Sequence, residues 1–211
     1  LPSVIDPTRY KVRPPANSEE ALTIGWMGTA TNLNSLHVLR RPIARLCRRF
    51  EGLRLKIVSE KALSLEGLPI EHKPFRLEEE IEDLQSFDIA IAPLVEDPWT
   101  RGKISTKILA YAATGLPIVA SNIEANRLYL RDGETGFLAG TLTEWEEKLT
   151  HLLESAALRQ TIGTAARTSV EEEFSLQTMV PRYLDLFKKV VEASPVEGPT
   201  DSEDTVTLSG Q

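Results

Sequence analysis

Two short segments carry the residue types and spacing that could do chemistry, and both point to an anion. The first is Gly28-Thr29-Ala30-Thr31-Asn32, where a glycine and small hydroxyl residues precede a predicted helix. A glycine backbone can approach a phosphate closely, and the amino-terminal end of a helix favours negative charge. The same residue types also occur at such turns for local reasons such as helix capping. This segment alone leaves a capped turn and a phosphate-binding loop equally open.

The second segment places three cations, Arg101, Lys103 and Lys107, at the start of a predicted helix. That end of a helix carries about half a positive charge, so cations there are unfavourable by a few tenths of a kcal/mol. A bound anion would remove the conflict, and Lys103 and Lys107 are four residues apart, on one helix face. Ser105 and Thr106 add hydroxyl donors. We therefore predict an anion site here in preference to a solvated basic loop.

Four further residues are weaker candidates for contacts with a nucleoside or a sugar: Pro93, Leu94, Trp99 and Glu124. The first two end a predicted buried strand. Trp99 could stack on a base or sugar, or it could simply cover the core. Glu124 could bind a sugar hydroxyl, or it could stabilise the start of a short helix. The single cysteine and three scattered histidines predict neither an internal disulfide nor a metal site.

The elements that must position these residues alternate along the chain. Apolar runs predict strands at 22–27, 53–58, 70–75, 88–94 and 117–120. Helical patterns cover 33–50, 77–86, 103–113, 124–130, 142–154, 156–173 and 176–193, with a break near Arg41 because Pro42 follows. The predicted fold class is α/β: a Rossmann-like, doubly wound, mostly parallel sheet with helices on both faces and extra C-terminal helices. In the strand order 3-2-1-4-5, ligands bind between the first and fourth strands, beyond Gly28 and Pro93.

Composition narrows the class of protein. The chain has 211 residues, is 41% hydrophobic and 26% charged, and carries a net charge of −7, which argues against a disordered protein and against a nucleic-acid binder. No stretch is long and apolar enough to predict a membrane span, and none has the order of a signal peptide. We expect three regions: an extended lead-in at 1–20, a folded domain at 21–193 and a disordered acidic tail at 194–211.

Several segments resemble the group 1 glycosyltransferases, which are retaining enzymes with two Rossmann-like domains. The resemblance is carried by PLVEDPWTRGKISTKILAYAATGLPIVAS, which is similar to their donor-binding segment, and by IGWMGTATNL, which is similar to their first glycine loop. Two later segments, NRLYLRDGETGFLAG and TEWEEKLTHLLESAALRQTIGTAARTSVEEEFSLQ, also resemble the family, in the same order. The likeness covers about 22–190 and only the second, nucleotide-sugar-binding half of such an enzyme. It implies an acceptor-binding domain before residue 1.

The resemblance transfers the family's site residues unevenly. It implies that Gly28, Thr29 and Lys107 contact the donor diphosphate. Because lysine and arginine can supply the positive charge, we expect no metal and no other cofactor. Many members have two glutamates eight residues apart, one for the sugar hydroxyls and one for the ribose. Here these positions hold Gly102 and Ala110, so ribose recognition needs another partner.

Our leading hypothesis is the donor-binding half of a retaining hexosyltransferase, with no catalytic residue of its own and no activity alone. The alternative is a non-catalytic nucleotide or nucleotide-sugar binding domain of the same fold, which the absent glutamates favour. A nicotinamide dehydrogenase module would need G-x-G-x-x-G after the first strand, and the chain lacks it. We expect a cytoplasmic protein that acts in glycan synthesis and binds no nucleic acid. The arginine run at 40–49 leaves open a membrane-facing or an interdomain surface; a solvated helix face is the simpler explanation. A peripheral location at the inner membrane face and a lipid-linked acceptor are also left open.

Overall fold

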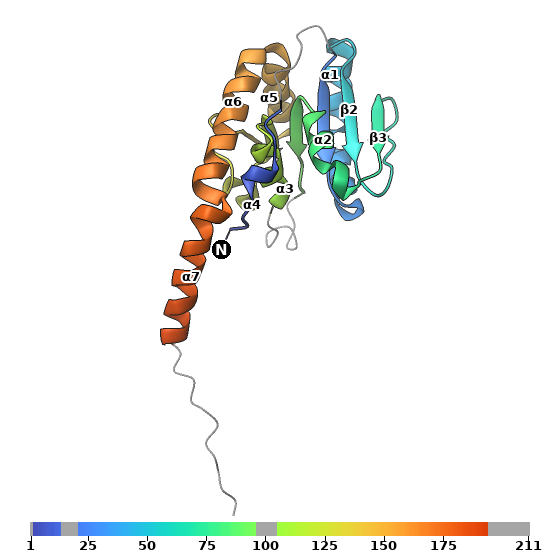
Figure 1. Ribbon diagram of the computed structural model, residues 1–211. Helices are drawn as coiled ribbons and strands as arrows, with labels where there is room; N and C mark the ends of the chain where they lie inside the picture. Colours follow the sequence, from blue (N-terminus) through green and yellow to red (C-terminus); the bar gives the residue numbers. More distant parts are fainter. Residues whose placement is uncertain (1, 14–20, 96–104, 194–211) are drawn as a thin grey trace, which may run out of the picture.

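The computed structural model describes residues 2–13, 21–95 and 105–193, and a six-stranded sheet forms its centre (Figure 1). The strands are β1 (Thr23–Met27), β2 (Arg54–Val58), β3 (Ile70–Lys73), β4 (Ile89–Ala92), β5 (Ile118–Ser121) and β6 (Phe137–Ala139). They run parallel in the order β3-β2-β1-β4-β5-β6. The predicted order of the first five strands is therefore confirmed, and the strand order reverses between β1 and β4.

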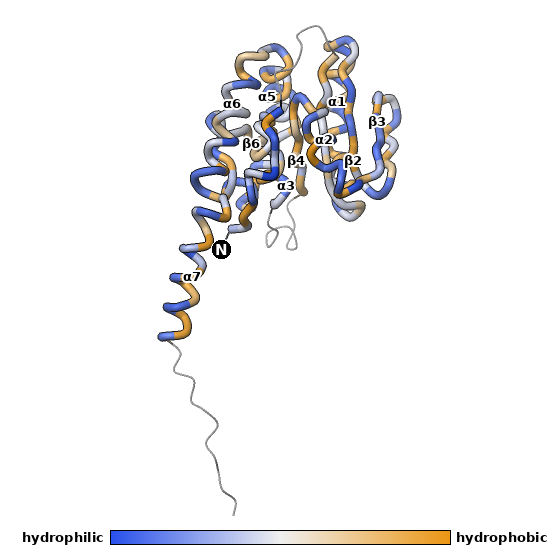
Figure 2. Tube along the Cα trace, viewed as in Figure 1, coloured by the Kyte–Doolittle hydropathy of each residue, from blue (hydrophilic) through white to orange (hydrophobic). Residues whose placement is uncertain are grey.

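Helices cover both faces of this sheet. On one face pack α2 (Glu80–Gln85), α3 (Thr106–Ala113), α6 (Ala156–Ser169) and the π-helical η5 (Val170–Phe174), around Leu84, Ile108 and Ala166. On the other pack the 3-10 helix η2 (Ala30–Leu39), α1 (Arg40–Arg49) and α5 (Leu142–Glu154). The helices η1 (Pro7–Arg9), η3 (Leu77–Glu79), α4 (Glu124–Arg127) and α7 (Leu176–Ala193) complete the described part. Burial on both faces explains why the central strands are apolar throughout (Figure 2).

The structure refines the predicted elements in three places. The helix predicted at 33–50 divides at Leu39 and Arg40, one residue before the expected break, into η2 and α1. The structure has a sixth strand, β6, which the sequence did not predict. This strand is only three residues long and forms by pairing with β5. The described part of the helix predicted at 103–113 begins at Thr106, and residues 103 and 104 lie outside the described residues.

Residues 2–13, here called the N-terminal strap, pack on the body, although the sequence assigned them to a separate lead-in. Ile5 N–H donates to the carbonyl of Phe174 at 3.1 Å, and Leu176 N–H donates to the carbonyl of Ile5 at 3.0 Å. At the N-terminal end of the strap, the carbonyl of Pro2 accepts from the hydroxyl of Tyr183, a residue of α7. The folded unit therefore includes the strap. Residue 1, residues 14–20 and the predicted tail at 194–211 lie outside the described residues.

A buried ion pair fixes the second end of the strap. Arg13 Nη2 donates to Asp88 Oδ1 at 2.6 Å, and Arg13 Nε donates to the carbonyl of Gln85 at 2.9 Å. The other oxygen of Asp88 accepts from the backbone N–H of Thr23 at 2.7 Å, at the start of β1. Because the Asp88 side chain is only 7% exposed, these donors replace the water that its carboxylate would otherwise bind.

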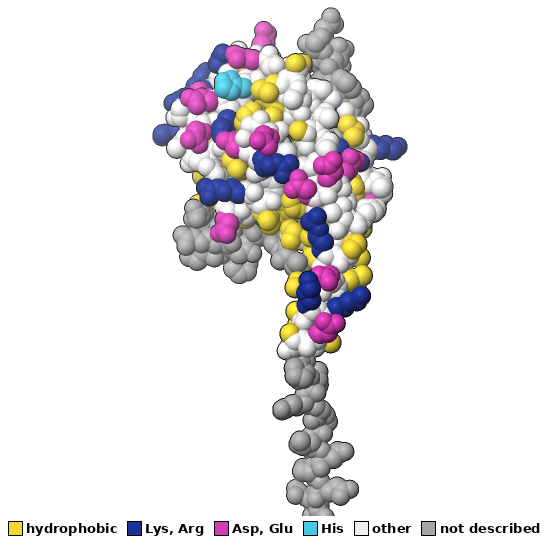
Figure 3. All heavy atoms as spheres, turned by 90° about the vertical axis from the view of Figure 1, so that its left-hand side faces the viewer, with side chains coloured by type: hydrophobic (Ala, Val, Ile, Leu, Met, Phe, Trp, Pro, Cys, Tyr) yellow, Lys and Arg dark blue, Asp and Glu magenta, His cyan; other side chains and the backbone are white. Residues whose placement is uncertain are grey.

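The last helix, α7, projects from the body and exposes apolar side chains along much of its length (Figure 3). The apolar face of α7 consists of residues three or four apart: Leu176, Val180, Leu184, Phe187 and Val191. Phe187 and Val191 are 58% and 70% exposed. None of the helices in the described ranges is long and apolar enough to cross a membrane. A face of this kind on a projecting helix is typical of a contact surface.

The ion pair gives the first prediction. Arg13→Ala should lower the free energy of unfolding by about 2–4 kcal/mol, because it leaves the Asp88 carboxylate buried without its counter-charge. For a chain of this size that corresponds to a fall of roughly 5–15 °C in the thermal midpoint. Lys11→Ala, at an exposed strap position, is the matched control and should leave the midpoint unchanged. Equal midpoints for the two variants would contradict a structural role for the strap.

Candidate functional site

A cavity of about 510 Å³ opens at the carboxyl ends of the strands, beside α3. Its walls include Gly28 and Thr29 after β1, Glu60 after β2, and Phe75 after β3. Thr106, Lys107 and Ala110 of α3, Glu80 of α2 and Tyr10 of the strap complete it. In a doubly wound sheet this edge, where the strand order reverses, is where ligands bind. The cavity thus occupies the place that the predicted strand order assigns to a ligand.

The two segments that the sequence singled out meet in this cavity. The Lys107 ammonium lies 4.4 Å from the ring centroid of Trp26, and the Nζ atom is buried. A Cβ on Gly28 would lie 2.9 Å from Lys107 Nζ and 2.8 Å from the Trp26 ring. No Cβ fits at that distance, so a glycine at position 28 is what lets the lysine lie against the loop. The structure therefore joins a cation to the glycine loop, on an indole ring that attracts cations.

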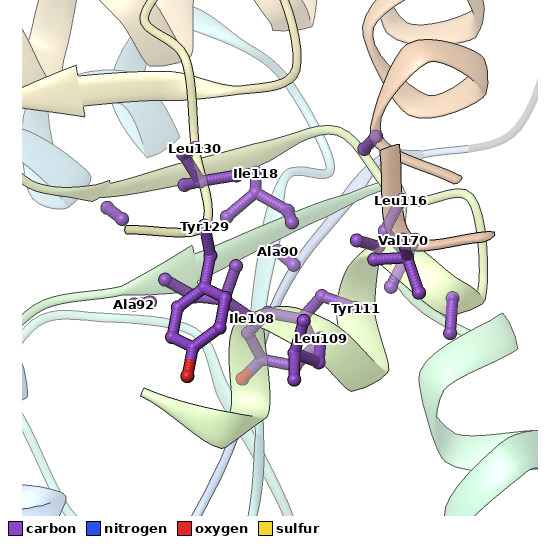
Figure 4. Close-up of a cluster of buried hydrophobic side chains, with 14 of the residues drawn as sticks. Ala90, Ala92, Ile108, Leu109, Tyr111, Leu116, Ile118, Tyr129, Leu130 and Val170 are labelled. Carbon is purple, nitrogen blue, oxygen red and sulfur yellow. The ribbon is translucent and has the colours of Figure 1, made fainter. Parts of the chain in front are cut away.

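Tyr111 sets the distance between α3 and that loop. Its buried hydroxyl accepts from the backbone N–H of Met27 at 2.8 Å and donates to the carbonyl of Met27 at 3.2 Å. Burial raises the pKa of Tyr111 far above its ordinary value, so the hydroxyl keeps the proton that this pair of bonds requires. Figure 4 shows Tyr111 with Ile108 and Leu109 of the same helix, beside Ala90 and Ala92 of β4. The end of β1 is thereby tied to one turn of α3.

Ser105 and Asn126 hold the start of α3. Ser105 Oγ donates to Asn126 Oδ1 at 2.6 Å, and Asn126 Nδ2 donates to the carbonyl of Ser121 at 2.7 Å. Ser121 Oγ in turn accepts from the backbone N–H of Leu94 at 2.9 Å. The sequence predicted Ser105 as a donor to a diphosphate. In the structure its side chain is buried and its proton is committed to Asn126, so Ser105 positions α3.

The remaining predicted residues divide into three groups. Thr29 and Thr106 line the same cavity as Lys107, and their contact with a diphosphate stays a prediction. Pro93, Leu94 and Glu124 are described but lie outside its lining: Pro93 is buried behind β4, and Glu124 is exposed at the start of α4. Trp99, Arg101 and Lys103 lie outside the described residues. Lys107 is therefore the predicted cation whose position the structure describes.

Two carboxylates of the cavity had no signal in the sequence. Glu60 Oε2 accepts from the backbone N–H of Ala30 at 3.0 Å, so this carboxylate rests on the loop after β1. Glu80 is half-buried, and burial raises its pKa while a hydrogen bond with Tyr10 acts in the opposite direction. Both belong to segments remote in the chain from the glycine loop, and only the parallel packing of β1 with β2 and the path of the strap bring them together. Across from them the α3 wall carries Ala110.

Comparison with known proteins places this geometry in a family. The model of the family described as "Glycosyl transferases group 1" matches residues 21–155. A trehalose synthase of Thermococcus litoralis is 34% identical over 70 residues, which cover 33% of this chain and 17% of that protein. The chain thus matches only about a sixth of the length of this curated relative.

Solved structures share the fold over most of the chain. HepE of Anabaena, in a structure described as a complex with UDP-glucose, superposes with a TM-score of 0.71 at 17% identity, over 88% of this chain and 56% of that one. The C-terminal domain of a group 1 glycosyltransferase (LpcC) from Francisella tularensis gives 0.65 at 15% identity, over 82% of this chain and all of that domain. This chain belongs to the group 1 glycosyltransferases and has the fold of their C-terminal half.

Proposed function

We propose that the chain is the donor-binding half of a retaining glycosyltransferase that takes a hexosyl group from a nucleoside diphosphate sugar. The observation that carries the proposal is the contact of Lys107 with the Gly28 loop inside a cavity at the strand ends. A cation, a loop backbone without a Cβ and the first turn of α3 together favour a diphosphate. The UDP-glucose complex of HepE, which has the same fold, supports a ligand of this class.

In the reaction the diphosphate is the leaving group, and its negative charge grows as the bond to the sugar breaks. Lys107 and the N–H groups at the start of α3 would stabilise this charge more in the transition state than in the ground state, which lowers the barrier. Arg101, Lys103 and Thr106 remain predicted diphosphate contacts, whereas the Ser105 hydroxyl is bonded to Asn126 and holds the start of α3. Because these groups supply positive charge, we propose a reaction without a metal. The acceptor and the face of attack belong to the other half of the cleft.

One observation favours the alternative, a domain that binds a nucleotide or nucleotide sugar without transferring it. The position on the α3 wall where many members have a glutamate is Ala110, and the other such position is Gly102. Transfer by a chain that includes both domains would decide against this alternative. Binding without transfer in that longer chain would decide for it.

The partners follow from the same geometry. The chain covers 56% of the length of HepE, so we propose that an acceptor-binding domain completes the cleft and contacts the apolar face of α7. For the arginine run, Arg40, Arg45 and Arg49 form ion pairs with Glu66, Glu146 and Glu154. These pairs support a solvated surface of the folded domain more than a membrane-binding patch or a site for a lipid-linked acceptor. We also propose that the protein acts in the cytoplasm, with or without contact to the inner membrane face.

Lys107 provides the direct test of the diphosphate site. Lys107→Ala should weaken UDP or GDP binding by about 1.5–3 kcal/mol, the scale of a hydrogen bond to a charged group, which is roughly ten- to a hundredfold. Lys107→Met should show the same loss while keeping an apolar stem on Trp26. Binding of the monophosphates should fall less, because they present fewer phosphate charges. Calorimetric titration of the wild type and of both variants, with the diphosphates and with the monophosphates, measures these affinities.

Lys188→Ala is the matched control, because Lys188 is exposed on α7, away from the cavity. It should leave every affinity unchanged. Wild-type affinity in both Lys107 variants, for whichever nucleotide the chain binds, would remove the main support for the proposed site.

Gly28→Ala tests the close approach of the loop and the lysine. The new Cβ would collide with the Trp26 ring and the Lys107 ammonium, so we expect a loss of about 1–3 kcal/mol in unfolding free energy and weaker nucleotide binding. Gly140→Ala is the control, because its nearest contact for a Cβ is 3.5 Å, an ordinary distance. Thermal unfolding and titration of both variants make the comparison; equal behaviour would show that the loop has room to spare.

The proposed function gives a prediction for activity. The 211-residue chain alone should transfer no sugar from UDP-glucose or another nucleotide sugar to any acceptor, because the proposed cleft also requires an acceptor-binding domain. Chromatographic detection of glycoside product is the measurement, with a complete two-domain enzyme of the family as the positive control. Multiple turnovers by this chain alone would refute a cleft shared between two domains.

A further inference from the structure

The described α3 wall of the cavity carries no carboxylate that could bind the ribose of a ribonucleoside diphosphate. Ribose hydroxyls are hydrogen-bond donors, and an ionised carboxylate is the strongest side-chain acceptor for them. On the α3 wall, one turn after Lys107, the residue is Ala110, which offers no acceptor. A carboxylate on another wall is therefore needed if a nucleoside lies beside this helix.

Glu60 is placed to meet this need. Its strand, β2, lies parallel to β1 with Val58 opposite Met27, and Gly28 N–H donates to the carbonyl of Val58 at 3.1 Å. Two residues later, Glu60 Oε2 accepts from the N–H of Ala30 at 3.0 Å. The carboxylate is thus held on the loop that lies against Lys107. A ribose is bonded directly to its diphosphate, and Glu60 and Lys107 line the same cavity, so a carboxylate on this loop lies on the same wall as the proposed diphosphate site.

The carboxylate also has capacity left for a ligand. A carboxylate has two oxygens and about four acceptor positions, and Ala30 uses one of them. Among the described residues Glu60 takes part in no ion pair, and its side chain is exposed to the cavity. A diol could therefore be bound without breaking the bond that fixes the carboxylate.

Glu80, the other carboxylate of the cavity, is less suited to the role. It lies on α2, is half-buried, and is hydrogen-bonded to Tyr10 of the strap. Burial raises its pKa, and its hydrogen bond with Tyr10 already uses part of its acceptor capacity. No hydrogen bond connects it to the glycine loop within the described residues. Glu80 is thus hydrogen-bonded to the strap, whereas Glu60 is hydrogen-bonded to the glycine loop.

We propose that Glu60 binds the ribose hydroxyls of the ligand and makes the site selective for ribonucleotides over 2′-deoxyribonucleotides. The proposal rests on the nucleoside diphosphate site proposed above. It agrees with a general feature of Rossmann-type sheets, in which an acidic residue beyond the second strand binds the ribose while the pyrophosphate lies on the first loop. In this chain the end of β2 would supply the carboxylate that α3 lacks.

The test compares ribose and deoxyribose forms of one nucleotide. Calorimetric titration of the 211-residue chain with UDP and 2′-deoxy-UDP gives the ratio of their dissociation constants; GDP and 2′-deoxy-GDP are the second pair. We expect the wild type to favour UDP by about tenfold or more, the scale of one hydrogen bond to a charged group. In Glu60→Gln the ratio should fall to about threefold or less, and in Glu60→Ala close to one.

The ratio is measured because loss of a negative charge near a diphosphate also strengthens binding of both nucleotides, and the ratio cancels this effect. Glu51→Gln, which removes the same charge from an exposed turn before β2, should keep the wild-type ratio. Thermal midpoints of all variants check that each is folded.

Three results would overturn the proposal, and they are distinguishable. If the wild type binds UDP and 2′-deoxy-UDP equally, ribose is not recognised, although the diphosphate site stands. If it discriminates but Glu60→Gln and Glu60→Ala discriminate equally well, another residue binds the ribose. If the folded wild type binds neither the uridine nor the guanosine nucleotides, the proposed function fails and this inference fails with it.

Discussion

The contact between α3 and the end of β1 is the constraint on which the rest of the site depends. Tyr111 holds both the N–H and the carbonyl of Met27, and Lys107, one turn earlier, lies against Gly28 over the Trp26 ring. A shift of α3 along the sheet would break both hydrogen bonds of the Tyr111 hydroxyl. A Cβ at residue 28 would crowd the Trp26 ring and the Lys107 ammonium, so the glycine allows their close approach.

The other parts of the fold hold this contact in place. Ser105 and Asn126 fix the start of α3 to the loop after β5, and the N-terminal strap closes the cavity at the far end. The strap itself is anchored by Arg13 on Asp88 at one end and by its bonds to Phe174 and Leu176 at the other. A segment that forms little secondary structure therefore contributes a wall to the site, because polar contacts at both ends define its path.

The cavity carries side chains of both charges, and this restricts the class of ligand that can bind there. Lys107 provides a buried positive charge, while Glu60 and Glu80 provide carboxylates on the facing walls. A simple anion would gain from the lysine and lose to the acids. A ligand with a negative diphosphate and a neutral, hydroxyl-bearing part matches both signs, and a nucleoside diphosphate sugar is of this kind. The mixture of charges therefore supports the proposed ligand class better than the cation alone.

The sequence by itself determined the fold class, from which the order of the first five strands followed, and it singled out the glycine loop and Lys107 as candidate site residues. Apolar strands alternating with amphipathic helices leave few topologies once crossovers are right-handed, and the lysine at a helix start beside a glycine loop is visible in the residues. The three-residue strand β6, the packed strap and the position of Glu60 on the glycine loop were decided only by the tertiary structure. Each depends on contacts between residues far apart in the chain: β6 forms on β5, Arg13 finds Asp88, and Glu60 meets Ala30. Local patterns indicate which face of a helix or strand is buried. They do not indicate which distant residue packs opposite that face, and the candidate site is formed by such long-range contacts.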